Sequence, residues 1–347
     1  MSLETLIRAM PKVELHVHLE GSIRPATLLE LARRNQVALP ASTLDELRAF
    51  YRFTDFAHFI QVYSIIIRCL QTPDDFALIA EEFGATMAEQ NIRYAEITWS
   101  PITHVARTGY SFAELLAGVN RGRAAALERY GVEMRWITDI VRNLHGRVED
   151  GMQTVAMAIE GREQGVVALG LGGLETGFPP ELFTAAFERA LAHGLHSIPH
   201  AGEAAGPESV WGALRSLGAV RIGHGIRAIE DPALVEHLRE RQIPLEVCPT
   251  SNVCTGIVAD IAAHPIRQLF DAGVYITVNS DDPPMFNTTL TDEYLALARD
   301  LGFDADAIER LVFNAVRAAL LDDAAKSELE QRMRAEFAGL RAEHLAT

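Results

Sequence analysis

Four short segments of this sequence combine histidine and carboxylate side chains in patterns that could bind a metal ion. The first, KVELHVHLEG at 12–21, alternates apolar and polar residues with the period of a β-strand, which places His16 and His18 on one face. Two imidazoles at the end of a rigid strand form half of a metal site. An edge strand with two solvated histidines is the alternative, and the segment alone does not separate the two.

The other three segments each follow a short apolar run. They are HAGE at 200–203, GHG at 223–225 and NSDDPP at 279–284. Taken with the first segment they supply a ligand set suited to a borderline-soft divalent ion, for which zinc is the leading choice, from His16, His18, His200 and Asp281. A catalytic site also needs a position for water, so Asp281 is expected to accept a proton from that water as well as to bind the metal.

Residues beside these ligands suggest acid–base and binding roles. Glu203 lies three residues after His200, and a carboxyl in a dry, partly apolar mouth can have a raised pKa and act as an acid. His224 lies between two glycines, which let a substrate or water approach closely; an ordinary strand-end histidine is the alternative. Asp282 is expected to point away from Asp281 and to bond the substrate. The remaining eight histidines are interpreted as structural; they lie at positions 58, 104, 145, 193, 196, 237, 264 and 344.

These segments need a scaffold that brings strand ends together. Short apolar, β-branched runs alternate with helical patterns, which indicates a parallel sheet. The predicted strands are residues 13–19, 92–99, 133–140, 166–171, 195–200, 220–223, 244–247 and 274–279. Helices are predicted between them over 111–130, 149–164, 180–193, 207–217, 232–241 and 265–272. This pattern predicts a single α/β domain, 1–347, built as a (β/α)₈ TIM barrel with its functional residues at the carboxyl ends of the strands.

Two regions depart from an even barrel. A helical insertion follows the first strand, at about residues 22–90, with helices predicted over 25–34, 43–50, 55–70 and 73–90. It contains an apolar stripe at helical spacing, made of Phe53, Phe56, Phe59, Ile60 and Tyr63. The stripe either packs in the core or forms a lid over the mouth of the barrel. Residues 304–321 and 324–345 are predicted as extra C-terminal helices that cover the barrel.

Composition narrows the class of protein and its partners. The net charge of −16 repels polyanions, so no nucleic-acid partner is expected. The longest apolar runs are shorter than a membrane span, and the first residues lack a secretory signal, so no membrane partner is expected. The three cysteines, at positions 69, 248 and 254, include no CxxC pair and fit a reducing cytoplasm.

The chain resembles the adenosine deaminase family of the amidohydrolase superfamily. The resemblance rests on five motifs in the family's order: PKVELHVHLEG at 11–21, HAGE at 200–203, RIGHG at 221–225, CPTSN at 248–252 and NSDDP at 279–283. It implies one Zn²⁺ per chain, held by His16, His18, His200 and Asp281. The catalytic residues it implies are Glu203, His224 and Asp281, with Glu203 as the acid toward the purine N1 and His224 beside the attacking water.

The same resemblance implies a set of substrate contacts, and these are His18, Glu20, Gly173, Asp282, Phe56 and Ile60. The backbone N–H of Gly173 would meet the purine N3, and Asp282 would share a proton with N7. Phe56 and Ile60 would cover the ligand as lid residues. Glu20 would reach toward the 5′ side of the ribose.

The implied reaction is the hydrolytic deamination of a 6-aminopurine nucleoside. Adenosine or 2′-deoxyadenosine is expected first, giving inosine or 2′-deoxyinosine and ammonia, and aminodeoxyfutalosine second, with adenine as a further alternative. Family members acting on adenosine often have aspartate at the position of Glu20, whereas glutamate is also seen in relatives that deaminate adenine or aminodeoxyfutalosine. Against adenine, such relatives tend to have a bulkier DSSE run where this chain has GGLE at 172–175, and glycines leave room for a sugar.

Two other classes compete with a nucleoside deaminase. One is a metal-dependent amide or phosphoester hydrolase, which often uses a modified lysine at a strand end to bridge two metals; no lysine ends the fourth predicted strand. The other is a non-catalytic nucleoside binder, which should have lost the acid or the base, yet Glu203 and His224 are both present. The sequence leaves the oligomeric state open.

Overall fold

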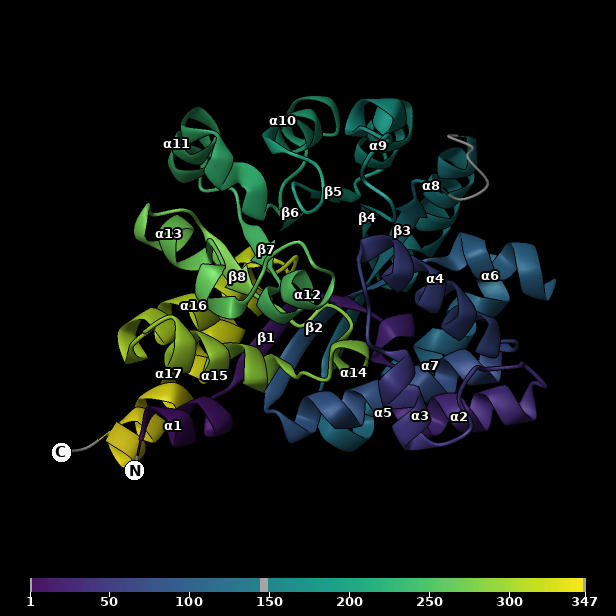
Figure 1. The fold of residues 1–347 in the computed structure, drawn as a ribbon, viewed down its shortest axis with the longest axis horizontal. Helices are drawn as coiled ribbons and strands as arrows, with labels where there is room; N and C mark the ends of the chain where they lie inside the picture. The colour runs from purple at the N-terminus through teal and green to yellow at the C-terminus, as the bar shows by residue number, and fades with distance from the viewer. Residues whose placement is uncertain (1, 144–148, 346–347) are drawn as a thin grey trace.

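Eight parallel strands form the centre of the computed structural model, which describes residues 2–143 and 149–345 (Figure 1). They are β1 (Lys12–His18), β2 (Ile92–Trp99), β3 (Glu133–Val141), β4 (Val166–Gly172), β5 (His196–Ala201), β6 (Ile222–His224), β7 (Leu245–Val247) and β8 (Ile276–Val278). Each strand pairs in parallel with the next strand of the sequence. The predicted (β/α)₈ TIM barrel is confirmed, and all eight predicted strands are present.

The first and last strands meet at a seam that side chains help to close. A bridge joins Val17 of β1 to Asp281, just beyond β8. Beside it, the side-chain Oδ1 of Asn279 accepts the backbone N–H groups of Leu15 and His16, at 2.9 and 3.1 Å. The side-chain oxygen of Asn279 therefore replaces a backbone carbonyl of the neighbouring strand as acceptor. The seam includes His16 and Asp281, two of the predicted metal ligands.

Helices surround the sheet (Figure 1). They are α1 (Leu3–Ala9), α2 (Pro25–Arg34), α3 (Leu44–Phe50), α4 (Phe56–Ile66), α5 (Pro73–Glu89), α6 (Pro101–Thr108), α7 (Phe112–Tyr130), α8 (Glu149–Gly161), α9 (Thr184–Ala192), α10 (Pro207–Ser216), α11 (Pro232–Arg241), α12 (Pro249–Cys254), α13 (Ile266–Asp271), α14 (Pro283–Phe286), α15 (Leu290–Asp300), α16 (Ala305–Ala318) and α17 (Asp323–Leu345). Proline occupies the first turn of α10 and α11, where its missing N–H breaks no hydrogen bond.

Several helix predictions need correction. The helix predicted over 180–193 begins as a 3₁₀ turn, Pro180–Phe183, before α9, and the one predicted over 55–70 ends as a 3₁₀ turn, Ile67–Cys69, after α4. The sequence analysis missed α1, α6, α12, α14 and α15. Most of these span too few turns for an amphipathic period to register, so flanking structure rather than periodicity fixes them.

The insertion between β1 and β2 carries α2 to α5, and α4 forms part of the mouth of the barrel. Phe56 and Ile60 of α4 line the cavity there. Phe59 also packs its ring against Phe53 and Phe286, with ring centroids 5.3 Å apart in both pairs. The apolar stripe therefore both covers the mouth and packs internally, which combines the two interpretations left open by the sequence.

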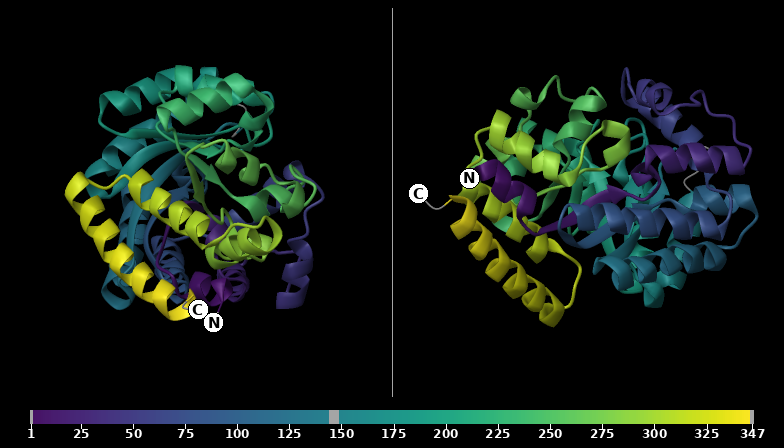
Figure 2. Two further views of the ribbon diagram at one scale, coloured as in Figure 1. Left: turned by 90° about the vertical axis from the view of Figure 1, so that its left-hand side faces the viewer. Right: turned by 90° about the horizontal axis from the view of Figure 1, so that it is seen from below.

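The C-terminal helices pack outside the barrel, as predicted. α16 contacts β8 and β1, and α17 contacts α16 and α1. Figure 2 shows the first and last helices lying side by side. Within residues 2–143 and 149–345, none of the helices combines the length and apolarity needed to cross a bilayer.

Candidate active site

A cavity of about 260 Å³ opens at the carboxyl ends of the strands, with α4 forming part of its wall. Most of the predicted site residues line it, namely His18, Phe56, Ile60, Gly173, His200, Glu203, His224, Asp281 and Asp282. His16 and Glu20 are not part of the lining. The fold thus brings residues from both ends of the chain into one pocket.

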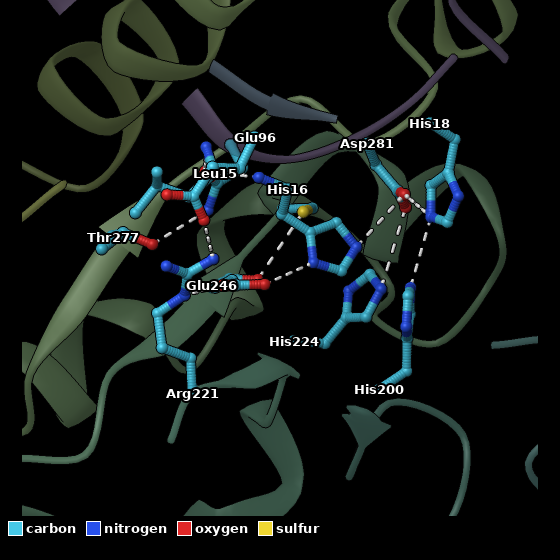
Figure 3. A network of polar contacts seen from close by, with 12 residues as sticks. Leu15, His16, His18, Glu96, His200, Arg221, His224, Glu246, Thr277 and Asp281 are labelled. Atoms are coloured by element: carbon cyan, nitrogen blue, oxygen red, sulfur yellow. Dashed lines mark hydrogen bonds and ion pairs between the residues drawn. The ribbon is translucent and has the colours of Figure 1, made fainter. Parts of the chain in front are cut away.

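The predicted metal ligands lie together (Figure 3). Ligand atoms of four side chains lie within 4.8 Å of one another, and these belong to His16, His200, His224 and Asp281. His18 joins them, because its Nε2 lies 3.3 Å from Asp281 Oδ1 and 3.3 Å from His200 Nε2. The barrel therefore contains a buried site of histidines and one aspartate that is built to hold a metal.

Two residues of this cluster have an unusual backbone. His224 and Asp281 have φ values of 58° and 65°, in the left-handed region that residues other than glycine seldom adopt. Such conformations cost of order 1–3 kcal/mol and persist where surrounding structure enforces them. Here the turn at each strand end aims both side chains into the cavity.

The hydrogen bonds of His16 leave its inner nitrogen free for a metal. Nδ1 donates to Glu246 Oε2 over 2.9 Å, so in the neutral ring Nε2 carries the lone pair. Nε2 is buried, has no hydrogen-bond partner among the described residues, and lies 3.5 Å from Asp281 Oδ1. A cation at that point would satisfy both atoms.

Charge in the cluster also fits a cation. Burial lowers the pKa of His16, but Asp281 and Glu246 outweigh it and raise that pKa to about 10. For His18, burial is likewise outweighed by Asp282 and Asp281, and its pKa is raised to about 9. Without a bound cation, both rings would be protonated at neutral pH, because the nearby carboxylates stabilise positive charge. The residues present therefore fit a divalent metal.

A buried ion-pair network supports His16 from behind (Figure 3). Arg221 Nε donates to Glu246 Oε1 over 2.5 Å, and its Nη2 donates to Glu96 Oε2 over 2.5 Å. Burial raises the pKa of Glu246, but Arg221 and His16 outweigh it and the net pKa is lowered. Glu246 therefore remains an acceptor, which keeps the proton of His16 on Nδ1 and orients the ring.

Glu203 is placed as the acid of the pocket. Burial raises its pKa well above the usual range, and the negative charges of Asp281 and Glu175 raise it further. Its Oε1 lies 3.7 Å from His224 Nε2. The raised pKa favours the protonated carboxyl, which can donate to a basic atom of a bound ring.

Asp282 is a second carboxyl with a raised pKa that faces the cavity. Burial raises its pKa well above the usual range, and the adjacent charge of Asp281 adds to the effect. Its buried Oδ1 has no hydrogen-bond partner among the described residues. A Cβ on Gly21 would lie 1.6 Å from that oxygen, so only glycine leaves room for it. Asp282 is thus free to bond a ligand.

A glycine, Gly173, forms part of the cavity wall, and Gly172 precedes it at the end of β4. Gly173 has φ 81° and lines the cavity. A Cβ on Gly172 would lie 2.4 Å from Asp139 Oδ2, and one on Gly173 would lie 2.7 Å from Asn143 Oδ1. Larger residues would therefore displace the polar side chains that line the cavity here.

Glu20 bonds groups of the protein beside the cavity. Its Oε1 accepts from the backbone N–H of Ser100 at 3.0 Å and from His104 Nε2 at 2.9 Å. Its Oε2 lies 3.5 Å from the hydroxyl of Tyr63. The carboxylate is buried, and its contact with a sugar stays a prediction.

Comparisons with known proteins bear on this pocket. The sequence model described as adenosine deaminase matches residues 11–336. The chain belongs to the adenosine deaminase family. It is therefore a deaminase, and the alternatives of an amide or phosphoester hydrolase and of a non-catalytic binder are set aside.

Curated relatives of the deaminase include two named activities. The aminodeoxyfutalosine deaminase of Streptomyces avermitilis is 42% identical over 94% of this chain and 91% of its own. The adenine deaminase of Bordetella parapertussis is 40% identical over 90% of this chain and 98% of its own. A zinc-bound amidohydrolase structure from Burkhoderia ambifaria has a TM-score of 0.92 at 27% identity, covering 100% of this chain and 96% of that one.

The sequence analysis missed several residues that support the site of the deaminase. Glu246, His104 and His264 are buried beside it, and the two histidines were interpreted only as structural. Glu246 carried a signal, because a glutamate inside the apolar strand β7 needs a buried partner. His104 and His264 carried none, since their partners are distant in sequence or on separate elements.

Glu175 is another missed residue, and it holds the loop that carries Glu203. Its carboxylate accepts four consecutive backbone N–H groups, those of residues 202 to 205, at 2.6 to 3.2 Å. It also accepts from the hydroxyl of Ser209 at 2.5 Å. A carboxylate can accept all of these bonds, whereas an amide replaces one acceptor oxygen with a donor.

Glu175→Gln should lower kcat about 10²-fold in the metal-loaded deaminase, because turning the loop misplaces Glu203 relative to the substrate. KM and zinc content should change little. Steady-state kinetics and metal analysis check this, with Glu181→Gln, an exposed glutamate, as the matched control. An unchanged kcat in Glu175→Gln would contradict the role of this carboxylate.

Proposed function

We propose that this chain deaminates a 6-aminopurine nucleoside with one Zn²⁺ per chain, and that aminodeoxyfutalosine is its preferred substrate. The observation that carries the proposal is the buried carboxyl of Glu203, with its raised pKa, in the same cavity as a histidine–aspartate metal site. Hydrolysis at the amino carbon of an aromatic purine requires a proton donor and a metal that act on the same ring.

The order of substrates differs from that expected from the sequence, where adenosine stood first. Relatives at 42% and 43% identity are aminodeoxyfutalosine deaminases, and those near 40% include adenine deaminases. Between these two, the cavity favours the larger substrate. Its lining also includes Ser64, Ser100 and Thr103, whose hydroxyl oxygens can accept hydrogen bonds from a sugar.

The ligand assignment follows from the donor atoms. His16 presents a lone pair on Nε2, and the oxygen of Asp281 nearest to it is also nearest to His18. Together with His200 they make a three-nitrogen, one-oxygen set, which suits zinc. The zinc-bound relative supports that choice. We assign His224 a role beside the metal rather than on it.

Each side chain then has a separate role in the proposed reaction. Zinc bound at this site supplies Lewis acidity, which lowers the pKa of water toward neutrality. Glu203 protonates the purine N1 and makes the ring electron-poor, while Asp282 donates to N7. The backbone N–H of Gly173 fixes N3. His224 and Asp281 orient the attacking oxygen, and ammonia leaves with a proton returned from the site.

The substrate assignment predicts a ranking of kcat/KM for zinc-loaded protein. Ammonia release should be fastest from aminodeoxyfutalosine, slower from adenosine and 2′-deoxyadenosine, and slowest from adenine, because the contacts beyond the purine contribute only with the nucleosides. A coupled ammonia assay over the four compounds measures this. Fastest turnover of adenine would instead support the adenine deaminase alternative and contradict a nucleoside substrate.

A further inference from the structure

His224 is the only one of the clustered histidines, among the described residues, whose outer nitrogen bonds an asparagine. Its Nδ1 lies 3.2 Å from the side-chain Nδ2 of Asn252, on α12. On the other side, Asn252 Oδ1 lies 3.2 Å from Nε2 of His264. All three side chains are buried, with at most 2% of their surface exposed. They form a continuous line that runs from His224 in the pocket, through Asn252, to His264.

The direction of hydrogen bonding along this line is fixed at its far end. The backbone N–H of Ile266 donates to Nδ1 of His264 over 3.1 Å, and a backbone N–H can only donate. Burial lowers the pKa of His264 to about 4, so the ring is neutral and its one proton lies on Nε2. That Nε2–H must donate to Asn252 Oδ1, which turns the amide nitrogen of Asn252 toward His224.

The amide nitrogen of Asn252 is also only a donor, so Nδ1 of His224 must accept. The proton of a neutral His224 is therefore left on Nε2, the nitrogen that faces the pocket. This Nε2 lies 3.7 Å from Glu203 Oε1 and 3.8 Å from Asp281 Oδ2. The opposite orientation of Asn252 would set two donors against each other at His264, which the buried line does not allow.

We propose that Asn252 and His264 are positioning residues that hold the proton of His224 on Nε2, so that this nitrogen donates to the attacking oxygen. In this arrangement His224 stabilises negative charge on the attacking oxygen, and Asp281 accepts the proton that this oxygen loses. It is also why Nε2 of His224, unlike Nε2 of His16, is unsuited to bind the metal. The position of the proton follows from the hydrogen bonds alone. Its role toward the attacking oxygen rests on the proposed function.

The proton position can be measured without turnover. In zinc-loaded protein labelled with ¹⁵N-histidine, the His224 ring should show a protonated Nε2 and an unprotonated Nδ1, with the His224→Gln variant identifying the signals. The same spectrum should show His264 in the same form. A proton on Nδ1 of His224 would overturn the proposal. Because no substrate is present, this result is independent of whether aminodeoxyfutalosine is the substrate.

Asn252→Asp tests the function of the line. A carboxylate only accepts, so it should draw the proton of His224 to Nδ1 and lower kcat roughly 100-fold or more, while KM and zinc content stay near normal. His264→Phe removes the donor that orients Asn252 and should lower kcat by about 10-fold, with two proton positions of His224 in the spectrum. Wild-type kcat in both variants would refute the positioning role.

A matched control separates positioning from packing. Thr255→Val alters the same helix end by removing a buried hydroxyl that donates to Ser251 O over 2.8 Å, but it leaves the line untouched. It should keep kcat near normal and leave the ring signals of His224 in place. If Thr255→Val lowers kcat as much as Asn252→Asp does, the effect is structural and the proposal fails.

Discussion

Glu203→Gln should retain its zinc and its fold yet lose about 10³-fold in kcat. The substitution keeps the size of the side chain and removes the one proton that the carboxyl donates to the ring. Because Glu203 is buried and not a metal ligand in our assignment, metal content should not change. Steady-state kinetics on aminodeoxyfutalosine, metal analysis and the melting temperature measure the three quantities.

Glu208→Gln is the control for this change. It makes the same carboxyl-to-amide change in the same segment at an exposed position, and it should leave kcat unchanged. Normal turnover by Glu203→Gln would sink the acid assignment, whereas loss of zinc would mean that the carboxyl supports the metal instead.

The raised pKa of Glu203 also predicts how kcat/KM changes on the alkaline side of its pH profile. The protonated form is the donor, so it is fully present below the raised pKa and is lost as the pH rises through it. kcat/KM should therefore fall on the alkaline side. In Glu203→Gln that limb should vanish, while any acidic limb set by the metal ligands stays.

Asp281→Asn should lower both metal content and rate, each by at least about 10²-fold. The aspartate supplies the only carboxylate oxygen within 3.5 Å of Nε2 of His16 and of His18 among the described residues, and an amide oxygen is a much weaker ligand. Asparagine tolerates the left-handed backbone that Asp281 adopts at φ 65°, so the turn should survive. Titration with zinc, followed by kinetics at saturating metal, separates the two effects.

Asp281→Ala should destabilise the protein more than Asp281→Asn does. It also removes the acceptor of the Ser251 hydroxyl at 2.6 Å and adds backbone strain, so it should melt at a lower temperature than Asp281→Asn. A variant at this position that binds zinc fully and turns over normally would rule out the ligand role of Asp281.

Local patterns predicted the barrel because each strand and most helices carry their own period. The metal-binding residues were predictable for a related reason: strand ends of a parallel barrel meet, so histidines at those ends must converge. The supporting residues were not. Glu246 reaches His16 across the sheet, and Asn252 meets His264 only because the loop after α12 folds back. Such partners depend on tertiary contacts that no local period encodes.

Glu20 shows the same limit from the other direction. Its place in the first motif was predicted, but its partner His104 lies on the short helix α6, which the sequence analysis did not predict. The role of Glu20 toward a sugar was implied by the family resemblance alone, and it stays a prediction. The hydrogen bond to His104 depends on α6 and could not be predicted from the motif.

The seam between β1 and Asp281 has a consequence for how the enzyme matures on the ribosome. His16 and His18 lie on the first strand, so they are made before most of the barrel, whereas Asp281 follows the last strand. A nascent chain can therefore offer only a partial set of ligands, and tight capture of zinc must wait until the last strand has been released and has joined the first. Metal acquisition thereby becomes a sign that synthesis of the barrel is complete.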